Sequence, residues 1–296
     1  MSSSIGLAHI IRQDDGSATG TWNGFTLKTA FQPIFAFRDG KLHIVAFEGL
    51  LRPFLSGEPM PPLEFFRIVP ASERLHVETL ARTLHLLNAA ACLDPVATIF
   101  INFDPSLFSE RAITESVLRD IRLVLHEAGI DPRRVVCELT EQKTTSQEAL
   151  YAFVEALRAN GLRIAVDDYG SEESDITRVR ELRPDVVKFD AAWVARLMDS
   201  GAGFALLTAL VDSFAARGID TVFEGIEEDW QLELAERSGA AMVQGFVLAR
   251  PQIMPGQLAA QVAQQQPDVP PMIPPAPDTT HRGNSAGKTF GRRTRP

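Results

Sequence analysis

Short apolar segments rich in β-branched residues alternate with helical stretches along most of the 296-residue chain. Each segment turns polar at its C-terminal end: HIVAFEGLLRP, ATIFINFDP, RVVCELTEQ, LRIAVDDYG, DVVKFD, DTVFEGIEE and MVQGFVLARP. Continuous apolar runs of this kind are typical of strands buried on both faces. Between them, stretches such as SVLRDIRLVLHEAG and SQEALYAFVEALRANG have helical spacing and a glycine suited to a C-cap. Alternation repeated about seven or eight times predicts a parallel sheet with helical crossovers, and hence an α/β fold of the (β/α)8 TIM-like type.

Composition fits one large soluble domain. A chain of this length with 45% hydrophobic residues can bury one core, and such barrels occupy about 250 residues. It lacks an apolar run of roughly 18 residues, and its N-terminus is not organised like a signal peptide. We therefore expect a cytoplasmic protein without membrane insertion. The net charge of -9 argues against DNA or RNA as partners, because polyanions attract clustered Lys and Arg.

The two ends of the chain differ in composition from the rest. Residues 1–24 are polar and predict an N-terminal extension too short for a sensory or cyclase domain, so we expect regulation to be intrinsic or to act in trans. The barrel domain is expected over residues 25–258. Residues 259–296 are rich in proline and end in a basic cluster. They are predicted to be disordered, because they cannot bury enough apolar surface to offset the ordering entropy, and they could bind a protein partner.

Carboxylates and one amide follow the apolar part of the strand-like segments: Glu48, Asn102, Glu138, Asp167, Asp168 and Glu224. In a barrel, the C-terminal ends of the strands converge on one face, so these side chains are expected to share one site. A single carboxylate at such a place could simply cap a helix or remain solvated. So many together repel one another unless cations or protons compensate. Since oxygen-only sites favour hard cations, the sequence predicts a site for Mg²⁺ or Mn²⁺.

The ordered series FQPIFAF, FEGLLRP, INFDP, CELTE, VDDYG, VVKFD, FEGIE and QGFVLARP resembles the motif series of the EAL domain over about residues 25–255. This resemblance implies a modified (β/α)8 barrel, two divalent cations and hydrolysis of cyclic di-GMP to linear pGpG. It also implies a homodimer formed near the loop after the fifth strand. The name-giving Glu-Ala-Leu reads Glu48-Gly49-Leu50 here. We expect the missing methyl group to have little effect beyond local backbone freedom.

The resemblance also implies roles for individual residues. Asp167 would bridge the two metals within the ligand set Glu48, Asn102, Glu138, Asp167, Asp168 and Glu224. Lys188 and Asp190 match a Lys-x-Asp pair whose lysine holds the attacking water, and Glu141 matches a glutamate that steadies the loop after the fifth strand. The expected substrate contacts are Gln32, Leu50, Arg52, Glu227 and Gln244.

The expected reaction is an in-line water attack assisted by two metals. Lys188 would favour the deprotonated water, and Glu224 could accept the proton, although the sequence leaves the acceptor open. Other interpretations of single residues also stay open. Gln32 could satisfy backbone groups at a strand end, Arg52 could be a structural ion-pair partner, and Lys188 could extend from the core towards solvent.

The segment after Asp168 departs from the family pattern. It reads YGSEESDITRV, where the family has phenylalanine, glycine, threonine, glycine and a serine-rich run. Because this loop couples metal occupancy to dimer contacts in the family, the change predicts reduced or differently regulated activity.

The leading hypothesis is a metal-dependent phosphodiesterase. The alternatives are a catalytically weak or inactive cyclic di-GMP receptor, and a protein-interaction module that uses the helical exterior or the tail.

Overall fold

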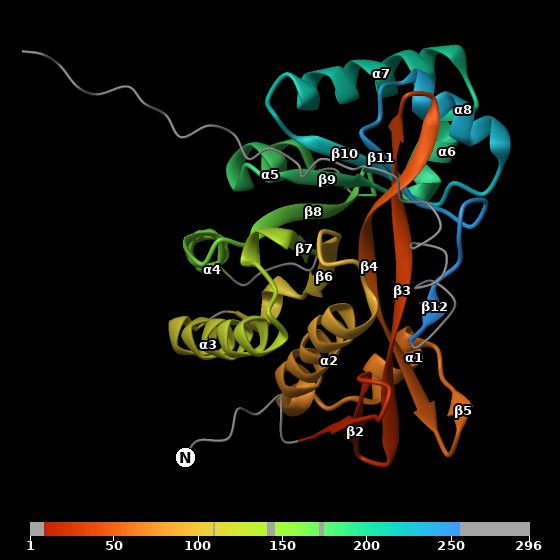
Figure 1. The fold of residues 1–296 in the computed structure, drawn as a ribbon. Coiled ribbons are helices and arrows are strands. Elements are labelled where there is room, and N and C mark those ends of the chain that lie inside the picture. The colour runs from red at the N-terminus through yellow and green to blue at the C-terminus, as the bar shows by residue number, and fades with distance from the viewer. Residues whose placement is uncertain (1–8, 109, 141–145, 172–174, 255–296) are drawn as a thin grey trace, which may run out of the picture. The chain divides into compact units, whose positions relative to one another are not determined.

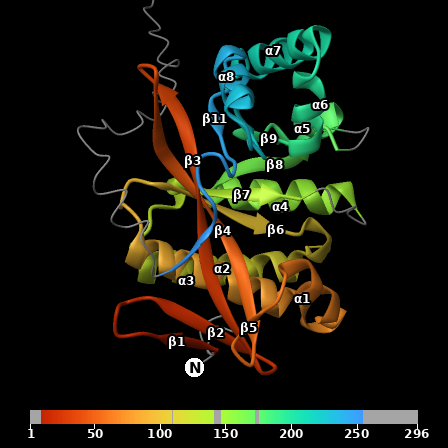
Figure 2. The same ribbon diagram turned by 90° about the vertical axis from the view of Figure 1, so that its right-hand side faces the viewer.

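A computed structural model of the chain describes residues 9–108, 110–140, 146–171 and 175–254, which are the residues discussed below (Figures 1 and 2). The proline-rich tail predicted over residues 259–296 lies outside the described residues. So does Glu141, to which the resemblance assigned a role beside the metal site.

Eight strands of the described chain close into a barrel: β3 (Phe25–Arg38), β4 (Lys41–Leu55), β6 (Thr98–Phe103), β7 (Val135–Leu139), β8 (Arg163–Tyr169), β9 (Val186–Phe189), β10 (Asp220–Phe223) and β11 (Met242–Val243). From β4 to β11 the neighbours run parallel. The barrel closes through β3, which pairs antiparallel with both β4 and β11. The prediction of a modified TIM-like barrel is confirmed.

β3 departs from the predicted pattern of parallel strands joined by helical crossovers. Arg38 pairs directly with Lys41, and the two residues between them, Asp39 and Gly40, have φ angles of 51° and 69°. This is the backbone of a tight hairpin turn, for which an Asp-Gly pair is strongly preferred. Because no helix separates β3 from β4, the chain reverses and the two strands form a long antiparallel ribbon, drawn in orange and red in Figures 1 and 2.

Helices cover the outside of the barrel: α1 (Pro62–Ile68), α2 (Ala71–Cys92), α3 (Arg111–Ala128), α4 (Gln147–Ala159), α5 (Asp175–Leu182), α6 (Ala191–Met198), α7 (Gly201–Ala215) and α8 (Asp229–Arg237). Two short 3-10 helices, η1 (Pro105–Leu107) and η2 (Pro132–Arg134), precede α3 and β7. The predicted glycine cap is present at Gly129, whose left-handed φ of 65° ends α3. None of the helices in the described ranges is long and apolar enough to cross a membrane.

Four short strands extend the sheet beyond the barrel. β1 (Ile10–Arg12) and β2 (Ala18–Trp22) continue it from β3, while β5 (Glu58–Pro59) pairs with β4 and β12 (Gln252–Ile253) with β3. Helix α2 packs against β2, β3, β4 and β6. As a result, every residue from Val77 to Ala89 is buried, including the polar ones.

An apolar layer fills the barrel below its mouth: Ile34, Ala46, Phe100, Val136, Ala165, Val186 and Val222, with Met242 packed against them. Side chains alternate along a strand, so the residue two positions closer to the mouth faces the same interior. That residue is i+2 in the parallel strands and i−2 in the antiparallel β3. The next layer is therefore polar throughout: Gln32, Glu48, Asn102, Glu138, Asp167, Lys188, Glu224 and Gln244.

Candidate functional site

Lys188 lies at the centre of this polar layer. Its Nζ is 2.6 Å from Glu138 Oε1 and 2.7 Å from Glu224 Oε1. Glu48 Oε2 and Asp167 Oδ1 each lie 3.5 Å from the same nitrogen. Side-chain exposure is only 1% for Lys188 and 0% for Glu138. One buried ammonium group is thus shared by carboxylates from four different strands or strand ends.

The charges of this cluster do not balance. Burial favours the neutral form of Lys188, but Asp167, Glu138, Glu224 and Glu48 outweigh it and raise the pKa of the lysine well above its usual value. Burial also raises the pKa of Glu138 well above its usual range, against the attraction of Lys188. It raises the pKa of Glu224 to about 8 in the same way. One cation cannot neutralise four carboxylates, so the cluster needs protons or further cations.

Hydrogen bonds fix the orientation of Glu48. Gln244 Nε2 donates to Glu48 Oε2 over 2.8 Å, and Asn102 Nδ2 donates to Oε1 over 3.4 Å. Gln32 lies directly opposite Glu48 in the β3–β4 pairing, and its own amide donates to the carbonyl oxygen of Ala249 over 3.2 Å. The structure therefore brings Gln32, Asn102 and Gln244 to the same mouth as the carboxylates.

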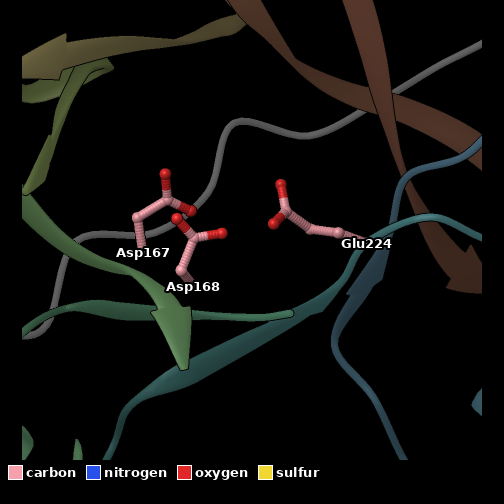
Figure 3. A group of neighbouring side chains, drawn as sticks. All are labelled: Asp167, Asp168 and Glu224. Atoms are coloured by element: carbon pink, nitrogen blue, oxygen red, sulfur yellow. The ribbon is translucent and has the colours of Figure 1, made fainter. Parts of the chain in front are cut away.

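Asp167 and Asp168 reach the mouth together through an irregularity in β8. Successive residues of a regular strand point to opposite faces. Here the β8–β9 register shifts between Val166 and Tyr169, and Asp168 has a left-handed φ of 55°. Aspartate tolerates this conformation better than most residues. Carboxylate oxygens of Asp167, Asp168 and Glu224 consequently lie within 4.8 Å of one another and point towards a common centre (Figure 3).

The donor set fits hard divalent cations. Among the described residues, Asp167 Oδ1 and Glu138 Oε2 are buried without a hydrogen-bond partner, as is Gln244 Oε1. Buried oxygens that lack hydrogen bonds are costly, and a cation coordinated by them would remove that cost. Carboxylate and amide oxygens are the ligands that Mg²⁺ and Mn²⁺ prefer.

A pocket of about 750 Å³ adjoins the cluster, with Asn102 and Asp168 in its wall. Leu50 and Arg52 also line it, because they follow Glu48 at two-residue steps along the same face of β4. Burial lowers the pKa of Arg52 from its usual value, although the negative charge of Glu48 opposes this. The pocket thus extends from the carboxylates at the barrel mouth to the half-buried guanidinium of Arg52.

Two of the predicted site residues lie outside this cluster. Asp190 accepts a hydrogen bond of 2.8 Å from the backbone N–H of Trp193 and so caps α6. Glu227 is exposed, and its backbone N–H donates to Gln231 Oε1 over 2.8 Å at the start of α8. Their proposed roles in catalysis and substrate binding stay predictions.

Sequence reasoning missed the pocket residues that come from α2 and the segment before it: Phe66, Arg74, Glu78, Ala81, Arg82 and His85. Glu78 forms ion pairs of 3.3 Å with both Arg74 and Arg82. The guanidinium of Arg74 lies 4.7 Å above the ring of Phe66. The four-residue spacing of these charges was the available signal, but such spacing is equally typical of an exposed helix face.

Known proteins match this chain over the barrel. The EAL domain matches residues 23–251. "Probable cyclic di-GMP phosphodiesterase PdeA" of Escherichia coli K12 is 25% identical over 209 residues, which is 69% of this chain and 28% of that protein. "Cyclic di-GMP phosphodiesterase RocR" of Pseudomonas aeruginosa is 29% identical over 203 residues, which is 67% of this chain and 50% of that protein.

A solved structure is similar as well. The manganese/cy-diGMP complex of Klebsiella pneumoniae BlrP1 at pH 9.0 aligns with a TM-score of 0.68 and 26% identity, covering 77% of this chain and 56% of that one. Of the two curated relatives, PdeA and RocR, this chain spans half of the length or less.

Proposed function

The chain belongs to the EAL domain family, and we propose that it is a metal-dependent phosphodiesterase that hydrolyses cyclic di-GMP to linear pGpG. The observation that carries this proposal is the buried cluster of oxygen ligands around Lys188, which adjoins a pocket lined by Arg52. The names of PdeA and RocR and the nucleotide bound in the BlrP1 structure support it.

Two divalent cations, Mg²⁺ or Mn²⁺, would be held by Glu48, Asn102, Glu138, Asp167, Asp168 and Glu224. When bound, such ions acidify a water molecule and neutralise charge on the attacking and leaving oxygens of a phosphodiester. The excess of carboxylates over cations in the cluster supports this assignment, because an anionic substrate would otherwise be repelled.

Lys188 has two tasks in this proposal. Its ammonium group offsets part of the charge of the four carboxylates, and it donates a hydrogen bond that holds the attacking oxygen. Since opposite charge nearby favours a deprotonated nucleophile, Lys188 lowers the cost of removing the proton from the water. Glu224 would accept that proton at a carboxylate oxygen, and the distance of 2.7 Å between its Oε1 and Nζ supports this role.

Arg52 and Gln244 orient the substrate phosphate and the metal ligand Glu48, respectively. The guanidinium of Arg52 is fixed by donation to the carbonyl oxygen of Leu51 over 2.9 Å and presents positive charge to a phosphate in the pocket. Gln244 holds Glu48 in place and thereby the metal that Glu48 would bind. Positioning of this kind is a large part of the catalysis of phosphoryl reactions.

A second candidate is a receptor that binds cyclic di-GMP without turnover. The altered segment that begins at Ser171 favours it, because only two residues separate this segment from the two aspartates of β8. The homodimer, the cytoplasmic location and a partner of the tail likewise stay proposals.

The deciding experiment incubates purified protein with cyclic di-GMP and Mg²⁺ or Mn²⁺ and follows pGpG by chromatography. Glu48→Ala and a chelator should abolish the product. Glu233→Ala, which removes an exposed carboxylate of α8, should leave it unchanged and controls for the loss of one negative charge. Saturable binding of cyclic di-GMP without pGpG would support the receptor. Absence of both binding and product would contradict the phosphodiesterase and the receptor alike.

A further inference from the structure

A buried hydrogen-bond network joins the N-terminal strands to the pocket. The backbone N–H of Ala18 donates to Asn88 Oδ1 over 2.7 Å, which fixes the orientation of the Asn88 amide. Its Nδ2 then donates to the carbonyl oxygen of Ala18 over 2.9 Å and to Thr29 Oγ1 over 3.1 Å. Both amide hydrogens of Asn88 are thereby used.

This arrangement determines which nitrogen of His85 carries the proton. Thr29 Oγ1 lies 3.0 Å from His85 Nδ1. Thr29 is buried, and among the described residues its hydroxyl hydrogen has no hydrogen-bond acceptor other than Nδ1. Since a buried hydroxyl hydrogen without an acceptor is costly, the hydroxyl donates to Nδ1. The proton of the neutral imidazole therefore resides on Nε2. Burial, with Arg82 and Arg52 acting in the same direction, lowers the pKa of His85 to about 3, so the ring stays neutral at physiological pH.

His85 forms part of the pocket wall beside Gly49. A Cβ atom at position 49 would lie 2.9 Å from Cγ of His85, so the glycine makes room for this ring. Within the described part of the chain, Nε2 has no hydrogen-bond partner. His85, a residue of the pocket wall, thus carries a neutral Nε2–H group that donates and, with its tautomer fixed by Thr29, cannot accept.

The same pocket offers an apolar surface suited to a purine. Leu50, Pro62, Phe66 and Ala81 contribute to its wall. Flat aromatic bases pack on such side chains and are distinguished by a few placed polar groups. Guanine presents an acceptor at O6, whereas adenine presents an amino donor at the corresponding position. A donor that cannot become an acceptor is complementary to O6 of guanine. It cannot form a hydrogen bond with the amino group of adenine.

We propose that His85 is a specificity-determining residue whose Nε2–H donates to O6 of a guanine base of the substrate, with Thr29 and Asn88 as positioning residues. This inference rests on the proposed function, because it assumes a guanine dinucleotide in the pocket. It assigns selection against adenine dinucleotides to a residue of α2 outside the metal cluster.

The test compares equilibrium binding of cyclic di-GMP and cyclic di-AMP by calorimetry, in the presence of Ca²⁺, for wild type and three variants. His85→Gln replaces the fixed donor by an amide that can rotate to donate or accept. Thr29→Val is nearly isosteric but removes the hydroxyl that fixes the tautomer, and Thr29→Ser retains that hydroxyl. We expect His85→Gln and Thr29→Val to reduce the guanine preference about tenfold, and Thr29→Ser to preserve it.

The ratio of the two affinities is the decisive readout. If His85 had only a structural role, its replacement would weaken the binding of both dinucleotides to the same extent. Thermal unfolding of each variant verifies the fold, and the two Thr29 variants decide the matter should His85→Gln fail to fold. An unchanged ratio in folded Thr29→Val and His85→Gln would overturn the assignment of His85. Wild type that binds neither dinucleotide would instead contradict the proposed function, and the two failures are therefore distinguishable.

Discussion

Nζ of Lys188 lies 2.6 Å from Oε1 of Glu138, and neither side chain is more than 1% exposed. Removing one partner of a buried ion pair leaves an uncompensated charge and costs about 3–5 kcal/mol. We therefore expect Lys188→Met to lower the free energy of unfolding by this amount in the presence of a chelator. Urea denaturation would measure it, with Lys41→Met, an exposed lysine of β4, as the control. A loss below about 1 kcal/mol would contradict the central role of Lys188.

Gly49→Ala should be destabilising, contrary to the expectation from sequence. The new Cβ would lie 2.9 Å from the ring of His85, which is held by Thr29, and overpacking of this kind costs about 1–3 kcal/mol. Gly201→Ala is the matched control, because nothing lies within 4 Å of its added Cβ and its φ is not left-handed. Combining Gly49→Ala with His85→Ala should recover part of the loss in urea denaturation, whereas strictly additive effects would rule out the clash.

Acid should destabilise the protein through His85. Its pKa is about 3 when folded, against 6.5 for an ordinary histidine, so between these values the unfolded chain binds a proton that the native state excludes. The contribution is present above pH 6.5 and decreases by about 1.4 kcal/mol for each pH unit below it. Unfolding free energies of wild type and His85→Gln at pH 8, 6.5 and 5.5 provide the measurement. Parallel curves for the two proteins would show that His85 does not exclude the proton.

Asp168 combines a backbone requirement with a charge, and two substitutions separate them. At its φ of 55°, alanine costs about 1–2 kcal/mol, whereas asparagine adopts this conformation readily. Asp168→Asn should therefore unfold like wild type in a chelator but bind Mn²⁺ more weakly, and Asp168→Ala should lose both stability and metal affinity. Equal stability of the two variants would argue against the left-handed conformation.

The sequence predicted the site better than the topology around it. Glu48, Glu138 and Lys188 each follow an apolar residue of the barrel interior by two positions, and this spacing is visible in the printed chain. Convergence of strand ends then brings them together without any knowledge of long-range contacts. The direction of β3 depends instead on the two-residue turn at Asp39 and Gly40, which lies outside the apolar runs of the sequence.

The buried face of α2 could not be predicted in this way. His85 and Asn88 are polar residues in an amphipathic stretch, a pattern that usually indicates a solvated face. They are buried because β2 and β3 pack against the helix, and this packing involves residues about 60 to 70 positions away. Such an arrangement follows from tertiary packing and leaves no periodic signal in the sequence.

The separation of Glu48 and Gln244 along the chain has a consequence for biosynthesis. Their side chains are hydrogen bonded although the two residues are 196 positions apart. A growing chain that has produced only its first strands has neither Glu224 nor Gln244, so the full ligand set does not exist until residue 244 has been synthesised. The first strands alone therefore cannot supply the full ligand set, in contrast to small domains whose folding depends on metal. That set is complete only when the last strands of the barrel have joined the first.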